Sequence, residues 1–290
     1  MAIKNPLRYP GAKSKLYDYV HELLVAQNKI GCTFYEPFGG SCAISLLLLE
    51  NKVIKKAVIN ELDPLIYNFW VAVFNHTEDL ISMINDIEIT LDNWYEFSKY
   101  RNDSYLQDKT CLQIGFAGLF LNRTNFSGIL KANPLGGLQQ KSKYTIDCRF
   151  NKKSVISSIR QLADFRLRVE LHNLDALDFL RLNLKYKRNK STFVYIDPPY
   201  YKEGPGLYRC FYSHQQHEDL ARFILSKAYP WLISYDNAQE IRTLYNNLSP
   251  VGIYMDYSVH TARTELELLI SNLEIPPVTL EVDVLGELTG

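Results

Sequence analysis

A short apolar strand followed by a glycine turn and an apolar helix is the feature that most limits how this chain can fold. Residues 32–52 read CTFYEPFGGSCAISLLLLENK, in which an aromatic strand passes through a Gly-Gly turn into a strongly apolar helix. Residues 55–70, KKAVINELDPLIYNFW, repeat this order with a second strand over 57–60 that ends in an acid. Two such units in series predict a parallel α/β sheet.

The same pattern returns in the second half of the chain. Strand-like sequence occurs within residues 168–180, 192–201, 231–248 and 265–272, and three of these stretches carry polar residues where the strand ends. The intervening residues differ, because a helical stretch there gives way to sequence rich in Gly, Asn, Lys and Tyr. We therefore predict a catalytic domain formed by residues 1–71 and 153–290, with a second module over 72–152.

Composition excludes several classes of protein. With 47% hydrophobic residues the 290-residue chain is globular, and its formal net charge of zero does not by itself indicate a polyanionic partner. The five cysteines are odd in number and lack CxxC spacing, which argues against a disulfide framework and a structural zinc site. We expect no metal. No signal peptide or membrane-spanning stretch is visible, so we expect a soluble cytoplasmic protein without a membrane partner.

Charge is concentrated in the predicted second module. Between residues 109 and 153 there are eight basic residues against one acid, Asp147. Asn, Gln, Phe and Tyr residues lie between these cations, and such side chains can bind base edges or stack on bases while cations bind phosphates. The mixture suits nucleic acid, although a solvated basic loop would explain this stretch equally well.

The sequence STFVYIDPPYYKEG, residues 191–204, ends a buried strand in an acid, two prolines and two tyrosines. In open α/β sheets ligands bind at the carboxyl ends of strands, which is where Asp197 to Tyr200 would lie. The prolines make the loop rigid, and a carboxylate with a backbone carbonyl can accept both hydrogens of an amine. An adjacent ring can stack on the base that carries the amine. A tight turn that caps a helix is the alternative for this motif alone.

Five segments in this order resemble the Dam-type, alpha-group family of N6-adenine DNA methyltransferases. They are LRYPGAKSKL at 7–16, YEPFGGSCAI at 35–44, INELDPLIYNFW at 59–70, FLNRTNFSG at 120–128 and YIDPPYY at 195–201. The resemblance covers nearly the whole chain. It implies an α/β, Rossmann-like S-adenosylmethionine-dependent methyltransferase sheet with an inserted, mainly helical DNA-recognition domain. It also implies S-adenosyl-L-methionine as methyl donor, S-adenosyl-L-homocysteine as product and double-stranded DNA as partner.

The resemblance assigns roles to individual residues in the catalytic domain. Asp197, Pro198, Pro199 and Tyr200 would be catalytic, and Asp197 would also border the cofactor. The other cofactor-binding residues would be Tyr9, Gly11 and Lys13 at the methionine end, the turn Glu36, Pro37, Phe38, Gly39 and Gly40, the ribose acceptor Glu61 with Asp63 as the alternative, and Asp175 at the adenine. Cys42 departs from the family pattern, where a small residue is usual, and its thiol would narrow the pocket.

The resemblance also assigns DNA contacts within the second module. The residues concerned are Asn122, Arg123, Asn125, Phe126, Lys131, Lys141 and Lys143. Phe126 would wedge into or stack on DNA, with core packing as the alternative, and the lysines would follow phosphates. The target adenine would leave the helix and stack on Tyr200, because its amine is paired and stacked inside a duplex.

Alternative chemistries remain for this site. Cytosine C5 methylation usually needs a Pro-Cys dipeptide, and none of the five cysteines follows a proline. N4-cytosine methylation uses the same lone-pair chemistry, and a catalytically silent DNA-binding protein of the same fold is the other alternative. No nuclease signature is visible, so we expect any restriction endonuclease to be a separate protein and this chain to be a monomer in solution.

Overall fold

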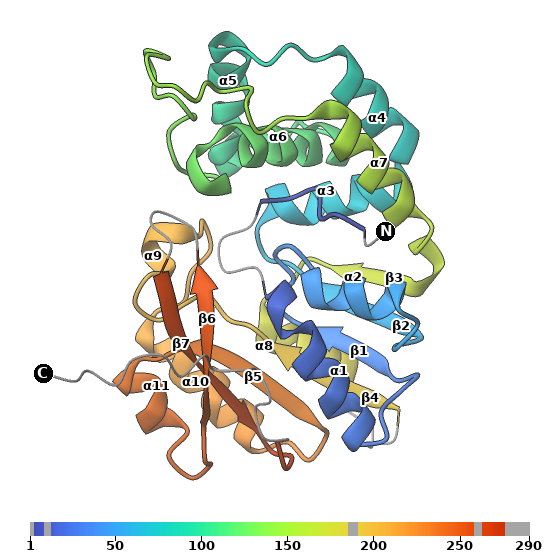
Figure 1. The fold of residues 1–290 in the computed structure, drawn as a ribbon, viewed down its shortest axis with the longest axis vertical. Helices are drawn as coiled ribbons and strands as arrows, with labels where there is room; N and C mark the ends of the chain where they lie inside the picture. The colour runs from blue at the N-terminus through green and yellow to red at the C-terminus, as the bar shows by residue number, and fades with distance from the viewer. Residues whose placement is uncertain (1–2, 9–12, 185–190, 258–262, 276–290) are drawn as a thin grey trace, which may run out of the picture.

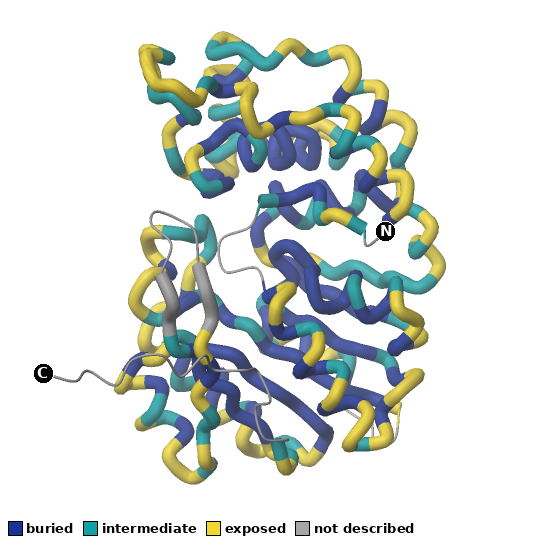
Figure 2. The backbone as a smooth tube through the Cα atoms, viewed as in Figure 1, coloured by how far each residue is buried: buried dark blue, intermediate teal, exposed yellow. Residues whose placement is uncertain are grey.

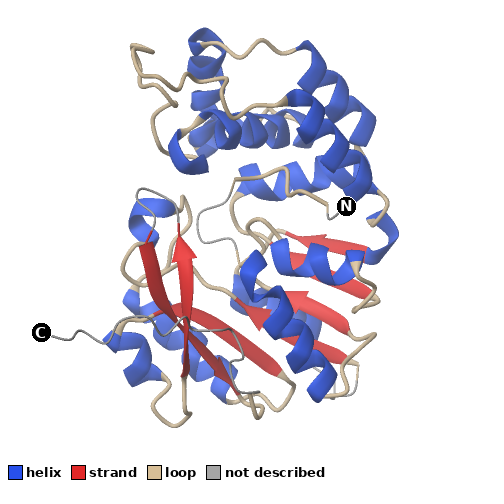
Figure 3. Cartoon of the chain, viewed as in Figure 1, coloured by secondary structure: helices blue, strands red, loops and turns tan. Residues whose placement is uncertain are grey.

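The structure is a computed structural model that describes residues 3–8, 13–184, 191–257 and 263–275. Within these residues one seven-stranded sheet forms (Figures 1 and 3) from β1 Thr33–Glu36, β2 Lys56–Asn60, β3 Val169–His172, β4 Thr192–Ile196, β5 Trp231–Asp236, β6 Val251–Tyr257 and β7 Arg263–Ser271. The strand order is β3-β2-β1-β4-β5-β7-β6, with β7 antiparallel to both neighbours and the other pairs parallel. This is a mixed α/β sheet of Rossmann-like topology, and the strand order reverses between β1 and β4.

Helices cover both faces of the sheet. On one face lie α1 Tyr17–Ala26 and α2 Ala43–Glu50, and on the other lie α8 Ala176–Leu184, α10 His214–Leu225 and α11 Gln239–Leu244. Strand side chains alternate between the two cores: Phe193 and Tyr195 of β4 join the first, whereas Val194 and Ile196 join the second. The β4 strand is therefore buried on both faces, which explains its continuous apolar sequence.

A helical layer lies beside the sheet at the top of Figure 1. It consists of α3 Pro64–Asn75, α4 Thr77–Asp86, α5 Leu91–Ser98, α6 Cys111–Thr124 and α7 Lys152–Ala163. Helix α6 packs closely along α3, because a Cβ at Gly115 or Gly118 would lie 2.4 Å from a backbone oxygen of that helix. Short helices complete the fold: η1 Ser14–Leu16, η2 Lys99–Arg101, η3 Asp103–Leu106, η4 Phe126–Gly128, η5 Arg166–Arg168 and α9 Gly204–Leu207.

The boundaries that we predicted for the second module fall inside helices. Residues 71 and 72 lie within α3, and residues 152 and 153 are the first two of α7. Helix α3 packs with α4, α6 and α7, and α7 also packs with α4, so the helical layer begins at α3 and ends at α7. Sequence composition placed the boundaries where the polarity changes, which is not where the helices end.

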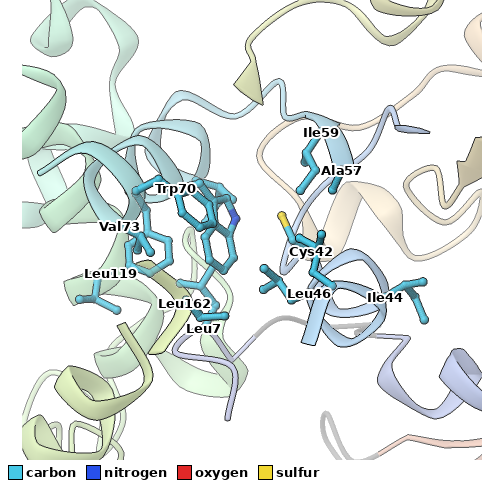
Figure 4. Close-up of a cluster of buried hydrophobic side chains, with 14 of the residues drawn as sticks. Leu7, Cys42, Ile44, Leu46, Ala57, Ile59, Trp70, Val73, Leu119 and Leu162 are labelled. Atoms are coloured by element: carbon cyan, nitrogen blue, oxygen red, sulfur yellow. The ribbon is translucent and has the colours of Figure 1, made fainter. Parts of the chain in front are cut away.

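The hydrophobic core is continuous between the sheet and the helical layer. Figure 2 shows buried backbone both in the central strands and along α6. In Figure 4, Trp70 of α3 lies near Leu119 of α6 and Leu162 of α7, and Cys42 at the start of α2 lies towards Ile59 of β2. The two parts of the chain are thus joined by apolar packing.

The strand predictions over 57–60 and 192–196 are confirmed by β2 and β4. We did not predict β6, which pairs with β7 at the edge of the sheet within the described residues. In the described part of the chain, none of the helices combines the length and the apolar character required to span a membrane.

Candidate active site

A cavity lies at the carboxyl ends of β1, β2 and β4. Its enclosed volume is about 70 Å³, counted as the space open to the centre of a water-sized sphere, and the empty space is about 750 Å³ when the solvent at its open mouth is included. Three segments line it: the loop from Glu36 to Ser41, residues 60–62, and the end of β4 with Tyr195, Asp197 and Pro199. This is the position at which open α/β sheets bind ligands.

The glycine turn after β1 is fixed by side chains from neighbouring elements. Asn60, at the end of β2, donates its amide to the carbonyls of Pro37 at 3.0 Å and Leu174 at 2.9 Å. The Trp70 indole donates to the carbonyl of Gly40 at 2.9 Å. These contacts hold the turn residues Glu36 to Gly40, which line the cavity.

Two buried carboxyls lie beneath this turn. Glu61 accepts hydrogen bonds from the backbone N–H groups of Gly40 at 2.6 Å and Asp63 at 2.7 Å, and Glu36 accepts from the hydroxyl of Ser45. Burial raises the pKa of Glu36 to about 8 and that of Glu61 to about 7. Acids in such surroundings suit a ligand that brings positive charge and hydroxyl donors, as a sulfonium compound with a ribose does.

The other acids expected at the cofactor have local partners. Asp63 caps α3 by accepting from the N–H of Leu65 and pairs with Arg209 at 3.0 Å. Asp175 accepts from the N–H of Leu177 at 2.9 Å, at the start of α8. Glu61 is therefore better placed than Asp63 to face the cavity, which it lines.

Cys42 does not narrow the cavity. Its thiol is buried in the hydrophobic core, and it is not among the residues that line the cavity. The residue adopts a left-handed backbone conformation, with φ of 53°, where α2 begins. Our expectation of a narrowed pocket is therefore wrong, because the turn directs this side chain away from the cavity.

Asp197 follows β4 directly and reaches into the cavity. Its Oδ1 accepts from the Ser234 hydroxyl at 2.8 Å and lies 3.2 Å from Lys13 Nζ. Burial raises the pKa of Asp197 to about 6, opposed by Lys13 and reinforced by Glu267. The carboxylate is therefore ionised at neutral pH in an enclosed site, where its electrostatic interactions are strong.

The loop after Asp197 is held from the end of β5. Pro198 and Pro199 have no N–H groups, and beyond Tyr200 the N–H groups of Tyr201 and Lys202 donate to the carboxylate of Asp236 at 2.9 and 3.2 Å. This explains the rigidity of the loop, which the double proline alone only suggested.

Tyr200 is enclosed rather than open to the cavity. Only 7% of its surface is exposed, its hydroxyl accepts from Lys13 Nζ at 2.7 Å, and that ammonium lies 4.5 Å from the ring centroid. The ring of Tyr208 makes an edge contact with it and itself lines the cavity. Lys13 is thus placed beside the catalytic loop, whereas Tyr9 and Gly11 lie outside the described residues.

Residues 9–261 match the family described as D12 class N6 adenine-specific DNA methyltransferase. The chain belongs to this family. As a D12 class methyltransferase it methylates adenine at N6 in DNA, and family membership implies S-adenosylmethionine as cofactor. The cavity and the Asp197 loop both lie within the matched residues.

One curated relative and two solved structures resemble this chain to different degrees. The D12 class chain is 25% identical over 218 residues to the Type II methyltransferase M.MjaIII of Methanocaldococcus jannaschii, covering 69% of this chain and 70% of that protein. A solved Pyrococcus horikoshii protein described as an RNA methyltransferase aligns with a TM-score of 0.41 at 8% identity over 93% of this chain and 89% of that one. The Escherichia coli protein yhhF, described as a methyltransferase, gives 0.35 at 12% identity over 89% and 85%. Both TM-scores are low, so the fold assignment rests on the strand order.

Two amides that we expected to contact DNA are buried in this D12 class protein. Asn122 pairs with the backbone of Arg8 in both directions, at 2.7 and 2.9 Å, and donates to the carbonyl of Gly128 at 2.9 Å. Asn125 accepts from the Trp94 indole at 2.7 Å, and its amide group donates to two backbone carbonyls. This arrangement gives no support to a DNA contact by either amide, because their polar atoms are used inside the protein.

The remaining residues expected at DNA have different surroundings. Phe126 is 43% exposed, which argues against packing of its ring in the core. Lys141 and Lys143 are also exposed. Lys131 donates to the carbonyl of Pro205, across from the catalytic loop. Among the residues that the structure describes, the Nε of Arg123 is buried and has no hydrogen-bond partner, and burial lowers the pKa of this group to about 10.

Several residues of the site had no signal that sequence analysis used. They are Asn60, Tyr208, Arg209, Ser234, Asp236 and Glu267. Ser234 and Asp236 could have been found, because they end a predicted strand next to β4 and every such end is a candidate. Glu267 lies within the apolar run of β7, where nothing distinguishes it from a solvent-facing residue.

Proposed function

We propose that the chain transfers a methyl group from S-adenosyl-L-methionine to N6 of an adenine extruded from double-stranded DNA, at the cavity between β1 and β4, and releases S-adenosyl-L-homocysteine. The supporting observation is the placement of Asp197 beside a cavity lined by buried carboxyls. The cofactor supplies the electrophilic methyl group on its sulfonium sulfur. The chain supplies the acceptors that orient the attacking amine.

Asp197 and the carbonyl of Pro198 take the two hydrogens of the adenine amine. The contacts from Ser234 and Lys13 are both to Oδ1 of Asp197, which leaves Oδ2 as the acceptor for the amine. Hydrogen bonds of this kind draw the nitrogen towards tetrahedral geometry and take its lone pair out of conjugation with the ring, which makes the nitrogen nucleophilic. With a pKa of about 6, Asp197 is ionised at neutral pH and is also suited to accept the proton that the amine loses.

On the cofactor side, the turn Glu36 to Gly40 and the acid Glu61 bind the ligand. Each oxygen of Glu61 already accepts one backbone N–H and has a further lone pair for a ribose hydroxyl. Asp175, next to the cavity residue Ala176, serves the adenine end, and Lys13 closes the methionine end beside Asp197.

The helical layer with residues 72–152 serves DNA recognition. Its basic segment, with Lys131, Lys141 and Lys143, follows phosphates, and exposed Phe126 contacts bases. Tyr200 stacks on the extruded base, which requires its enclosed ring to become accessible when DNA binds; Tyr208, which lines the cavity, makes an edge contact with this ring. By analogy with the Type II relative, a separate restriction endonuclease is the expected companion of this monomeric, cytoplasmic enzyme.

Asp197→Ala tests the catalytic assignment. We expect methyl transfer to be lost while S-adenosylmethionine affinity stays within about tenfold, because the lost group orients the target amine. Asp178→Ala is the control, since Asp178 is an exposed acid of α8 that pairs with nearby Arg181. Turnover by Asp197→Ala equal to that of the control would overturn the assignment.

Base extrusion has its own test. A fluorescent adenine analogue at the target position should brighten when the protein binds. Tyr200→Ala should lose most activity on duplex DNA, whereas Tyr208→Ala should retain more. If Tyr200→Ala methylates duplex DNA as fast as the unaltered enzyme, Tyr200 does not stack on the base.

A further inference from the structure

A buried carboxylate from β7 lies behind the catalytic loop. Glu267 is 2% exposed and is on the strand face that joins the first hydrophobic core through Leu269. Its Oε1 accepts from the Tyr200 hydroxyl at 2.7 Å and lies 3.3 Å from Lys13 Nζ. The same ammonium lies 3.2 Å from Asp197 Oδ1. One cation is thus shared by two carboxylates, and one tyrosine joins the cation to the second of them.

We propose that Glu267 is a positioning residue for methyl transfer, which shares Lys13 with Asp197 and anchors the hydroxyl of Tyr200 so that both catalytic groups keep their places. This inference rests on the proposed function of Asp197 and Tyr200. Glu267 itself would touch neither the adenine nor the cofactor.

Stability alone gives little reason for an acid at this position. Removing a carboxylate from water costs several kcal/mol, and a buried ion pair is often no more stabilising than apolar residues of the same volume. The neighbouring residues Leu268, Leu269 and Ile270 are apolar and buried, so an apolar residue at 267 would extend the core. A carboxylate that contacts two residues of the catalytic loop region is better explained by what it does to them.

The pairing pattern of the sheet explains why Lys13 turns to Glu267. Glu267 lies directly opposite Asp236 of β5, and two carboxylates in such a pair repel each other. Asp236 is stabilised by the N–H groups of Tyr201 and Lys202, whereas Glu267 is stabilised by Lys13 and Tyr200. The loop after β4 is therefore held on one side by Asp236 and on the other by Glu267.

Charge sharing sets the electrostatics of Asp197. The charged or titratable groups around it, among the described residues, include Lys13, Glu36, Glu267, Tyr195, Tyr208 and Tyr235. Burial is the largest cause of the raised pKa of Asp197. The charge of Lys13 lowers this pKa, and the charge of Glu267 raises it. Replacing Glu267 by an amide of the same shape leaves Lys13 to Asp197 alone, so the pKa of Asp197 falls.

Glu267→Gln is the deciding variant, with Glu274→Gln as the control because Glu274 is an exposed acid just beyond β7. We expect kcat on duplex DNA to fall by about tenfold or more in Glu267→Gln, with the KM for DNA within about twofold. The acid limb of the kcat against pH profile should move to lower pH. In the free protein, carbon-detected NMR should show the Asp197 carboxyl titrating at lower pH than the value of about 6 in the unaltered chain.

The outcomes separate the positioning role from a packing role. A loss of kcat without movement of the acid limb or of the Asp197 titration would mean that Glu267 only packs, and behaviour like Glu274→Gln would also overturn the inference. If Glu267→Gln does not fold, Tyr200→Phe decides, because it removes only the hydroxyl link. A severalfold fall in its kcat supports the anchor, and an unchanged kcat overturns it. The proposed function fails separately, if Asp197→Ala remains fully active.

Discussion

Asn122→Ala should destabilise the protein, because this amide joins three chain segments. Asn122, on α6, bonds the backbone of Arg8 through both its oxygen and its nitrogen, and it also binds the carbonyl of Gly128. Truncation leaves one N–H and two carbonyls without these partners. Each unsatisfied buried group costs about 1 to 3 kcal/mol, and partial access of water near Arg8 favours the lower end, so the expected loss is about 3 kcal/mol.

The loss converts into a melting shift. With an unfolding entropy of about 2.1 cal/mol/K per residue, a 290-residue chain should lose about 5 °C for 3 kcal/mol. Differential scanning calorimetry measures this directly, with Asn133→Ala as the control, since Asn133 is an exposed amide of the same segment. Equal melting temperatures for the two variants would refute the structural role of Asn122. DNA affinity lost at an unchanged melting temperature would return Asn122 to the DNA surface.

Three further predictions concern the cavity and its borders. The carboxyls at the cavity have pKa values raised by burial, so the free protein should lose stability as pH rises from about 5 to 8. The rise in melting temperature caused by S-adenosylmethionine should therefore be larger at about pH 8 than at about pH 6. An equal rise at the two pH values would contradict this. Gly128→Ala should lower the melting temperature far more than Gly137→Ala. Both residues have positive φ, but a Cβ at position 128 would lie 1.9 Å from the Arg8 carbonyl oxygen, whereas position 137 is open. Similar falls in melting temperature would show that the contact with Arg8 relaxes. Arg209→Gln should weaken cofactor binding on the order of tenfold relative to Arg166→Gln, a control at an exposed arginine. The reason is that Arg209 pairs with two acids and holds the segment whose aromatic residues line the cavity. Equal dissociation constants of the two variants for S-adenosylmethionine, measured by calorimetric titration, would argue against this role.

The parallel part of the sheet could be predicted from the sequence because each strand is a short apolar run closed by a polar residue. That signal located β4 and, with it, Asp197 and its loop. The contacts that fix the loop could not be predicted, since Lys13, Asp236 and Glu267 come from distant parts of the chain and meet only through the strand order. Their pairing depends on tertiary placement that no local pattern contains.

The role of the amides in α6 and after it was equally hidden. A polar residue within an apolar helix is needed both for reading a base and for capping a backbone, and the sequence pattern is the same in both cases. Asn122 and Asn125 serve the backbone, and the glycines at 115 and 118 serve helix packing. The predicted boundary at residues 71 and 72 lies inside α3, because this helix is apolar along its length and the sequence does not show where it begins and ends.

The chemical position of the transferred methyl group shows whether this protein methylates adenine at N6 and whether Asp197 is needed for the transfer. Purified protein is incubated with duplex DNA and methyl-labelled S-adenosylmethionine, and the DNA is digested to nucleosides and analysed by mass spectrometry. We predict that the unaltered protein places the label in N6-methyldeoxyadenosine and that Asp197→Ala leaves the DNA unlabelled. Label in N4-methyldeoxycytidine, or equal labelling by Asp197→Ala, would contradict it.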